Sequence, residues 1–324
     1  MFNKSIKVPL MKFVVSIILI LCFFSAKAQH IDSIITIESL QQTVWYLSSD
    51  SLHGRLTGSK GAEDAAIYIR GAFKENGIRP LQNINNYFDS FGVYINKIRA
   101  VGINVVGAIP SNCNNDSIVV ISAHYDHIGQ GNDLFFNNNH NKYDSIYNGA
   151  NDNASGTAAL LEIAKYYARL KLNKYTLLFV AFSGEELGEI GSQYFANNIK
   201  CSVIKAVINF DMLGRPNTST NSKCTVVSDN NYATVRQLNK SLQKQSTENK
   251  IKFFIKDNHP EDRLYFRSDH YSFDGKVKNI FTLMTTSTWD QYYHSVKDEY
   301  ETIDFDFLLS TTKKIAMACR IFIE

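Results

Sequence analysis

The sequence of 324 residues has few of the features that mark specialised protein classes. It shows no internal repeat and no long low-complexity run, which argues against a repeat architecture. No linker divides the chain into separate parts. Cysteine is scarce, with five in total, and the spacings match neither a zinc ribbon nor a redox motif. A chain of this length can bury a sizeable core, so we expect one α/β domain after the N-terminal segment.

Only the N-terminus carries a long apolar run. Three lysines precede the apolar residues 13–24, and a small-x-small sequence, Ala26-Lys27-Ala28, follows them. This order is typical of a signal peptide. The run is shorter than the roughly 20 residues that a bilayer span needs, although an uncleaved anchor is an alternative. We expect residues 1–28 to be removed, leaving 29–324 as an exported protein, periplasmic or extracellular, without stable membrane association.

The chain also has no excess of positive charge once residues 1–28 are set aside. That segment holds four of the 34 basic residues and none of the 31 acidic residues, so the mature net charge is −1. A balanced charge gives no electrostatic reason to expect a nucleic acid or a membrane surface as a partner.

The cysteines leave their chemistry open. Export permits disulfides among Cys113, Cys201, Cys224 and Cys319, but three pairings are possible and buried free thiols are an equal alternative. Cys22 would suit a lipoprotein, except that Leu21 stands where a small residue is expected.

Hydrophobic patterns predict alternating strands and helices. Continuous apolar strands separated by helices favour a largely parallel sheet that is covered on both faces. The predicted fold is therefore an α/β three-layer sandwich around a mixed, largely parallel sheet. We expect helices at residues 34–47, 60–75, 155–170, 187–197, 232–245 and 305–322, a strand pair within 87–109 at one side of the sheet, and strands at 118–123, 176–182, 204–210, 224–228, 251–255 and 280–284.

Ionisable groups follow the three central predicted strands. The first strand ends in His124-Tyr-Asp126, the second runs into Glu185-Glu186 and the third ends on Asp211. Because ligands bind beyond the carboxyl ends of strands in open α/β sheets, these groups are expected to converge. Asp152 lies on a glycine-bounded loop that opens a helix, where it would reach the same edge; an ordinary capping loop is the alternative.

The donor set indicates a metal. Imidazoles and carboxylates without cysteine suit zinc or a similar divalent ion. A second imidazole is available in His294, which follows the last predicted strand. His127, His140 and His259 are expected to be solvated loop histidines, and Asp269 and His270 to have supporting roles.

These motifs, with Ser268-Asp-His270 and Tyr293-His294, occur in the order found in the co-catalytic di-zinc aminopeptidases. Over about residues 35–324 the chain resembles this family, which is related to glutamate carboxypeptidase II and the glutaminyl cyclases. The resemblance implies the zinc exopeptidase fold and two Zn²⁺ ions per chain. It also implies a cis peptide bond after Asp152.

The resemblance further implies a role for each matching residue. His124 and Asp211 would hold one zinc, Glu186 and His294 the other, and Asp152 both. Asp126 would orient His124, Glu185 would be the general base, and Tyr265 would stabilise the oxyanion.

The implied activity is that of a zinc metallo-aminopeptidase, a hydrolase that removes N-terminal residues from peptides through a metal-bound water. A glutaminyl-cyclase-like transferase with a single zinc is one alternative, and an inactive binding homologue is another. Dipeptidase or carboxypeptidase action, the preferred side chain and the oligomeric state stay open.

Overall fold

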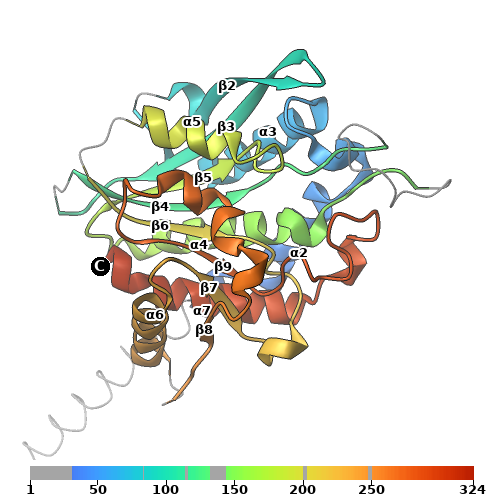
Figure 1. The fold of residues 1–324 in the computed structure, drawn as a ribbon. Coiled ribbons are helices and arrows are strands. Elements are labelled where there is room, and N and C mark those ends of the chain that lie inside the picture. Colours follow the sequence, from blue (N-terminus) through green and yellow to red (C-terminus); the bar gives the residue numbers. More distant parts are fainter. Residues whose placement is uncertain (1–30, 83, 114–115, 132–143, 200–202, 247–249) are drawn as a thin grey trace, which may run out of the picture.

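A computed structural model describes residues 31–324 except 83, 114–115, 132–143, 200–202 and 247–249 (Figure 1). The predicted signal peptide, His140 and Cys201 lie outside the described residues. Cys113, Cys224 and Cys319 are free thiols. Across the described ranges, no helix combines the length and the apolar character that crossing a membrane requires.

A sheet of nine strands forms the middle layer of the molecule (Figure 1). Its strands are β1 (Arg79–Pro80), β2 (Phe88–Ile95), β3 (Ile98–Ile109), β4 (Ser117–His124), β5 (Thr176–Phe182), β6 (Val203–Phe210), β7 (Cys224–Val227), β8 (Phe254–Lys256) and β9 (Ile280–Met284). The helices are α2 (Ile37–Leu47), α3 (Lys60–Glu75), α4 (Gly156–Leu170), α5 (Ile190–Asn198), α6 (Asn231–Gln245) and α7 (Phe305–Ile323).

The strand order is β1-β3-β5-β4-β6-β9-β7-β8, with β2 also paired to β3. The neighbours β5, β4, β6 and β9 run parallel, as do β7 and β8, whereas the other ladders are antiparallel. The mixed sheet is therefore confirmed, with its parallel part at the centre. The predicted strand pair at one side is the hairpin of β2 and β3.

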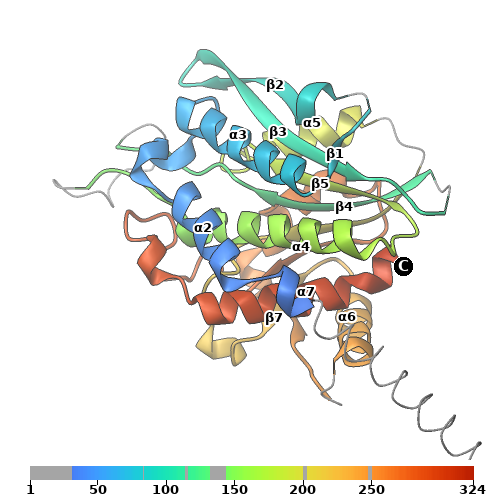
Figure 2. The same cartoon turned by 180° about the vertical axis from the view of Figure 1, so that it is seen from behind.

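Alternation along the central strands builds two apolar layers. In β4, Val119 and Ile121 point to the larger core cluster and Val120 to the smaller one, because successive side chains leave opposite faces of a strand. Helices α2, α3, α4 and α7 lie on the larger-cluster face (Figure 2). Phe195 of α5 and Phe273 pack on the other face.

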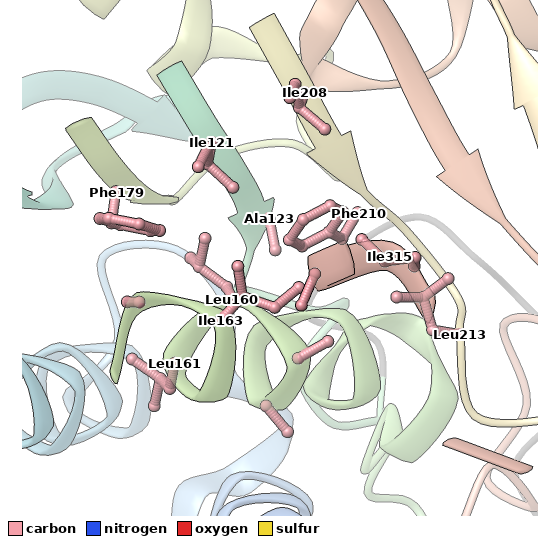
Figure 3. Close-up of a cluster of buried hydrophobic side chains, with 14 of the residues drawn as sticks. Ile121, Ala123, Leu160, Leu161, Ile163, Phe179, Ile208, Phe210, Leu213 and Ile315 are labelled. Carbon is pink, nitrogen blue, oxygen red and sulfur yellow. The ribbon is translucent and has the colours of Figure 1, made fainter. Parts of the chain in front are cut away.

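Helix α4 is the best-buried helix of the fold, and it determines where the Asp152 loop lies. Its apolar side chains Leu160 and Ile163 are fully buried beneath Ile121 and Phe210 of the central strands (Figure 3). Burying side chains of this size contributes about 1.5–3 kcal/mol each relative to exposure. The N-terminus of α4, and the loop that precedes it, are thereby held at the carboxyl ends of β4 and β6.

Three predicted boundaries differ from the structure by three residues each. The helix expected from residue 34 begins at Ile37, after its capping residue Thr36. The helix expected from residue 187 begins at Ile190, since the N–H groups of Gly188 and Glu189 both bond to the carbonyl of Glu185 in a tight turn. Gly188 and Glu189 have positive φ angles, which end any helical continuity there. The strand expected from 251 begins at Phe254.

Candidate metal centre

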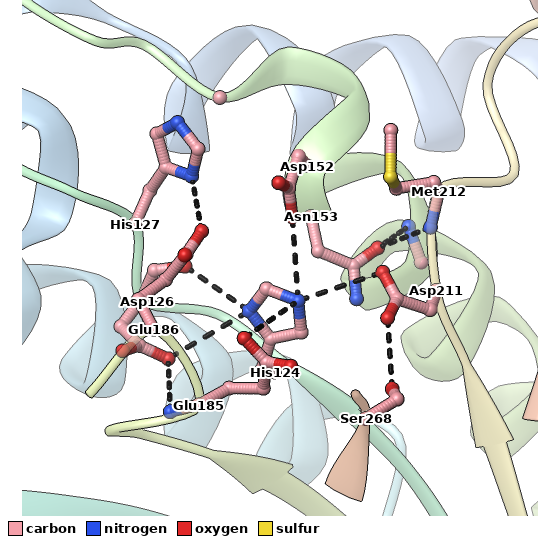
Figure 4. A network of polar contacts seen from close by, with 12 residues as sticks. His124, Asp126, His127, Asp152, Asn153, Glu185, Glu186, Asp211, Met212 and Ser268 are labelled. Carbon is pink, nitrogen blue, oxygen red and sulfur yellow. Dashed lines mark hydrogen bonds and ion pairs between the residues drawn. The ribbon is translucent and has the colours of Figure 1, made fainter. Parts of the chain in front are cut away.

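The carboxyl ends of three adjacent parallel strands form the floor of the site (Figure 4). His124 is the last residue of β4, which pairs with β5 on one side and with β6 on the other. Glu185 and Glu186 follow the end of β5 after Ser183 and Gly184, and Asp211 directly follows β6. The sheet therefore brings these side chains together at one edge, as the sequence predicts.

The loop carrying Asp152 precedes α4 and is held to the end of β6. Asn153 donates from its amide to the carbonyl of Phe210 and accepts from the backbone N–H groups of Gly156 and Met212. Gly149 has a φ of +55°, and a Cβ there would lie 2.2 Å from the carbonyl oxygen of Asp152. The peptide bond between Asp152 and Asn153 is cis, as the resemblance implied.

Asp152 lies between two imidazoles. Its Oδ1 is 3.4 Å from His124 Nε2, and its Oδ2 is 3.3 Å from His294 Nε2. His124 Nε2 also lies 3.5 Å from Asp211 Oδ1, and His294 Nε2 lies 3.0 Å from Glu186 Oε2. Each imidazole therefore faces two carboxylates, and both sets share Asp152.

His127 is where the sequence-based expectation was wrong. The sequence predicts a solvated loop residue at this position, but the side chain is fully buried and its Nδ1 lies 2.8 Å from Glu186 Oε1. Potential ligand atoms of His127, Asp152, Glu186 and His294 all lie within 4.8 Å of one another. The spacing of three residues from His124 was the one sequence signal that could have placed His127 at the site.

Asp126 contacts both His124 and Glu185. His124 Nδ1 lies 3.2 Å from the carbonyl oxygen of Asp126 and 3.7 Å from its carboxylate. That carboxylate accepts from the hydroxyl of Thr57 at 2.8 Å and from the backbone N–H of Glu185 at 3.3 Å. Asp126 therefore orients the His124 ring mainly through its main chain, while its side chain holds the Glu185 backbone.

The pKa values of the histidines and carboxylates in this cluster are strongly shifted by their neighbours. Burial acts to lower the pKa of His124, but Glu185 and three aspartates raise it well above its usual range. Burial likewise opposes protonation of His294, yet Glu186 and Asp152 bring its pKa to about 10. The pKa of Glu186 falls to about 2, because His294 and His127 outweigh burial. The carboxylates around the two imidazoles therefore favour a positive charge at this place.

The donor groups therefore fit a divalent metal. The Oδ1 atom of Asp211 is buried and has no hydrogen-bond partner among the described residues, as expected for an oxygen kept for a cation. Imidazole nitrogens and carboxylate oxygens without sulfur suit zinc. The other oxygen of Asp211 accepts from Ser268 at 2.8 Å, which fixes the direction of the first.

Glu185 differs from the other carboxylates because it lies farthest from an imidazole. Its Oε2 is 4.0 Å from His124 Nε2. Burial raises the pKa of Glu185 well above its usual range, and Glu186 and Asp211 add to this although His124 opposes it. A carboxylate with a raised pKa accepts a proton readily.

Two buried groups that sequence reasoning missed support the site from behind. The carboxylate of Asp298 accepts from the backbone N–H groups of Asn151 and Asp152, and Arg215 donates to it at 2.8 Å. Arg55 is fully buried and donates to the carbonyl oxygens of Asn148 at 2.6 Å and of Gly149 at 3.0 Å. Neither follows a strand, so the strand-end argument does not reach them.

The remaining predicted residues have varied surroundings. The hydroxyl of Tyr265 donates to Asp274 at 2.8 Å, so this structure does not direct it at the imidazoles. Asp269 and His270 are buried, and His270 Nδ1 lies 2.7 Å from the hydroxyl of Thr282. His259 is partly exposed and contacts Glu261, as a solvated loop residue would.

Comparison with known proteins identifies the family. Residues 104–319 match the model of the family described as Peptidase family M28. The chain belongs to peptidase family M28. Leupeptin-inactivating enzyme 1 of Streptomyces exfoliatus is 34% identical over 167 residues, which are 50% of this chain and 32% of that protein. The chain thus spans about a third of the length of this curated relative.

Solved structures share the fold of this M28 chain. A zinc aminopeptidase from Bacillus subtilis has a TM-score of 0.67 at 15% identity, covering 90% of this chain and 96% of that one. Porphyromonas gingivalis glutaminyl cyclase also has a TM-score of 0.67 at 15% identity, covering 89% and 99%. At such identities the likeness concerns the fold alone, so chemistry has to be argued from the site.

Proposed function

We propose that this M28 chain is an exported zinc-dependent exopeptidase, and specifically an aminopeptidase that releases N-terminal residues from peptides. The observation that carries the proposal is the position of Asp152, whose two carboxylate oxygens face different imidazoles at 3.4 and 3.3 Å. A carboxylate shared in this way suits a pair of ions rather than one.

Two zinc ions would be held by five residues. His124 and Asp211 would bind the first ion, Glu186 and His294 the second, and Asp152 both. The interatomic distances of 3.0–3.5 Å within these sets support the assignment. When bound, such ions supply Lewis acidity and bring the pKa of water from 15.7 to about 7.

Glu185 would move the proton. Its carboxylate is only slightly exposed and has a raised pKa, so it can accept a proton from the attacking water and return it to the leaving amine. Asp126 would keep Glu185 in place through the hydrogen bond to its backbone N–H, and His124 through the ring contact. Tyr265 would stabilise the oxyanion only after its hydroxyl leaves Asp274.

A glutaminyl-cyclase-like transferase with one zinc is the second candidate, favoured by the equal TM-score of the cyclase structure. The test combines metal counting with two substrates, Leu-p-nitroanilide and a peptide with N-terminal glutamine. Two zinc equivalents and hydrolysis of the anilide support the aminopeptidase. One equivalent with cyclisation and no hydrolysis would overturn it. Absence of both activities would indicate the inactive binding homologue.

Two further points need separate measurements: the end of the peptide at which the enzyme cleaves, and export. Peptides with free and with blocked N-termini would separate aminopeptidase from carboxypeptidase action, because only the former requires a free amine. We also propose that residues 1–28 are a signal peptide and 29–324 a single catalytic domain. Mass spectrometry of the protein isolated from the cell envelope or medium should then find Gln29 as the first residue.

A further inference from the structure

His127 lies beside the proposed metal ligands but belongs to neither pair of them. It follows β4 by three residues, and its backbone N–H bonds to the carbonyl of Arg55 at 3.3 Å. The ring fills the space that Gly149 leaves open, since a Cβ on Gly149 would lie 2.6 Å from the Cγ of His127. Its ring also meets that of His294 edge-on, with centroids 5.6 Å apart. The chain thus fixes the orientation of a fully buried imidazole.

Distances separate a metal ligand from a hydrogen-bond donor here. Zinc binds nitrogen and oxygen at about 2.0–2.1 Å in tetrahedral geometry, so neighbouring ligand atoms lie about 3.3 Å apart. His294 Nε2 lies 3.3 Å from Asp152 Oδ2 and 3.0 Å from Glu186 Oε2, near that spacing. His127 Nδ1 lies 2.8 Å from Glu186 Oε1, which is the length of a charge-assisted hydrogen bond.

Glu186 therefore uses its two oxygens differently. Oε1 faces His127, and Oε2 faces His294 and the shared carboxylate of Asp152. A hydrogen bond from His127 to Oε1 prevents rotation of the carboxylate and leaves Oε2 for a cation. Ligating carboxylates are commonly held in this way by a neighbouring donor, and losing the donor typically weakens metal binding 10- to 100-fold.

We propose that His127 is a positioning residue that donates from Nδ1 to Glu186 and thereby sets the affinity of the zinc site formed by Asp152, Glu186 and His294. The inference rests on the proposed function, because it assumes that these three residues bind zinc. It assigns no direct metal contact to His127.

The test is a zinc titration against a competing chelator, using wild type, His127→Ala and His127→Asn. The side-chain amide of asparagine offers a donor near the position of Nδ1. We expect all three proteins to hold two ions at saturation. In His127→Ala the site of Asp152, Glu186 and His294 should lose 10- to 100-fold in affinity, and His127→Asn should recover most of it. His53→Asn, which removes an exposed imidazole outside the groups of potential ligand atoms, is the matched control and should bind like wild type.

Cobalt substitution distinguishes positioning from ligation. If His127 only holds Glu186, the visible absorption of the cobalt-loaded protein should keep its band positions in both His127 variants. Equal zinc affinity in wild type and His127→Ala would overturn the inference while leaving the proposed function intact. Loss of one saturating equivalent and a changed cobalt spectrum in both variants would show a direct ligand and also overturn it. If the wild-type protein bound no zinc, that result would contradict the proposed function, and this inference would fail with it.

Discussion

The carboxylate of Asp298 accepts a hydrogen bond from the backbone N–H of Asp152 at 3.0 Å. The same carboxylate accepts from the N–H of Asn151 and from Arg215, and all of these groups are buried. Asp298 lies only four residues after His294, so it ties the loop of the second imidazole to the shared aspartate. The two loops therefore depend on one carboxylate for their relative position.

Replacing Asp298 should damage both stability and metal binding. In Asp298→Ala, two buried N–H groups lose their acceptor and Arg215 loses one of its two carboxylate partners. Removing one partner of a buried ion pair costs about 3–5 kcal/mol of unfolding free energy. Zinc affinity should fall roughly 10- to 100-fold. Urea denaturation and a zinc titration measure the two effects, and the exposed Asp116→Ala should change neither.

Glu185→Gln separates catalysis from metal binding. Glutamine keeps the shape of the side chain but cannot accept the proton, so turnover of Leu-p-nitroanilide should fall 100- to 10,000-fold. Zinc content should stay at the wild-type level, because Glu185 is not among the proposed ligands. Elemental analysis and steady-state kinetics on the same preparation provide both numbers. Activity near that of wild type would show that another residue is the base.

Single ligand substitutions should reveal how Asp152 is shared. Asp152→Ala removes the one residue that faces both imidazoles, so both ions should be lost or bound far more weakly. His294→Ala should mainly weaken the binding of one ion, and His124→Ala should mainly weaken the binding of the other. The zinc equivalents retained after dialysis check this pattern. If Asp152→Ala retained one ion, as is expected of His294→Ala, Asp152 would not be shared.

Much of the fold was predictable from local sequence. The central strands β4, β5 and β6 are largely apolar runs with ionisable residues at or shortly after their ends, and both features are visible in the sequence. Parallel pairing then brings His124, Glu186 and Asp211 to one edge without further information. One of the less accurate boundaries lies where a turn depends on positive φ, at Glu189, and no apolar pattern encodes such a turn.

The groups behind the site could not be predicted in this way. His127 follows a strand in a polar stretch, and its burial comes from Gly149 and Arg55, which lie far from it in the chain. Arg55 sits in a short segment between α2 and α3 and bonds to the loop carbonyls of Asn148 and Gly149. Such contacts depend on how loops meet in three dimensions, so the periodicity of apolar residues in the sequence cannot predict them.

Asp269 should make the metal-free protein less stable as the pH rises. Its side chain is fully buried and neither carboxylate oxygen has a hydrogen-bond partner among the described residues. Burial raises the pKa of Asp269 to about 7 from a usual value of 3.8; His124 and Ser192 oppose this shift, and Asp126 and Glu189 add to it. The folded state therefore binds a proton more tightly than the unfolded state. This contribution to stability is complete below about pH 4 and is lost as the pH rises through about 7.

Asp269→Asn is neutral at every pH and should lack this component. Each unit of pKa difference corresponds to about 1.4 kcal/mol, so the pH-dependent loss of unfolding free energy in wild type should reach a few kcal/mol between pH 4 and 8. Denaturant unfolding in the presence of a chelator, at intervals across that range, measures it. Asp116→Asn is the exposed control and should follow the wild-type curve. If the curves of Asp269→Asn and wild type ran parallel, the carboxyl of Asp269 would have the same pKa in the folded and the unfolded protein, and burial would not raise it.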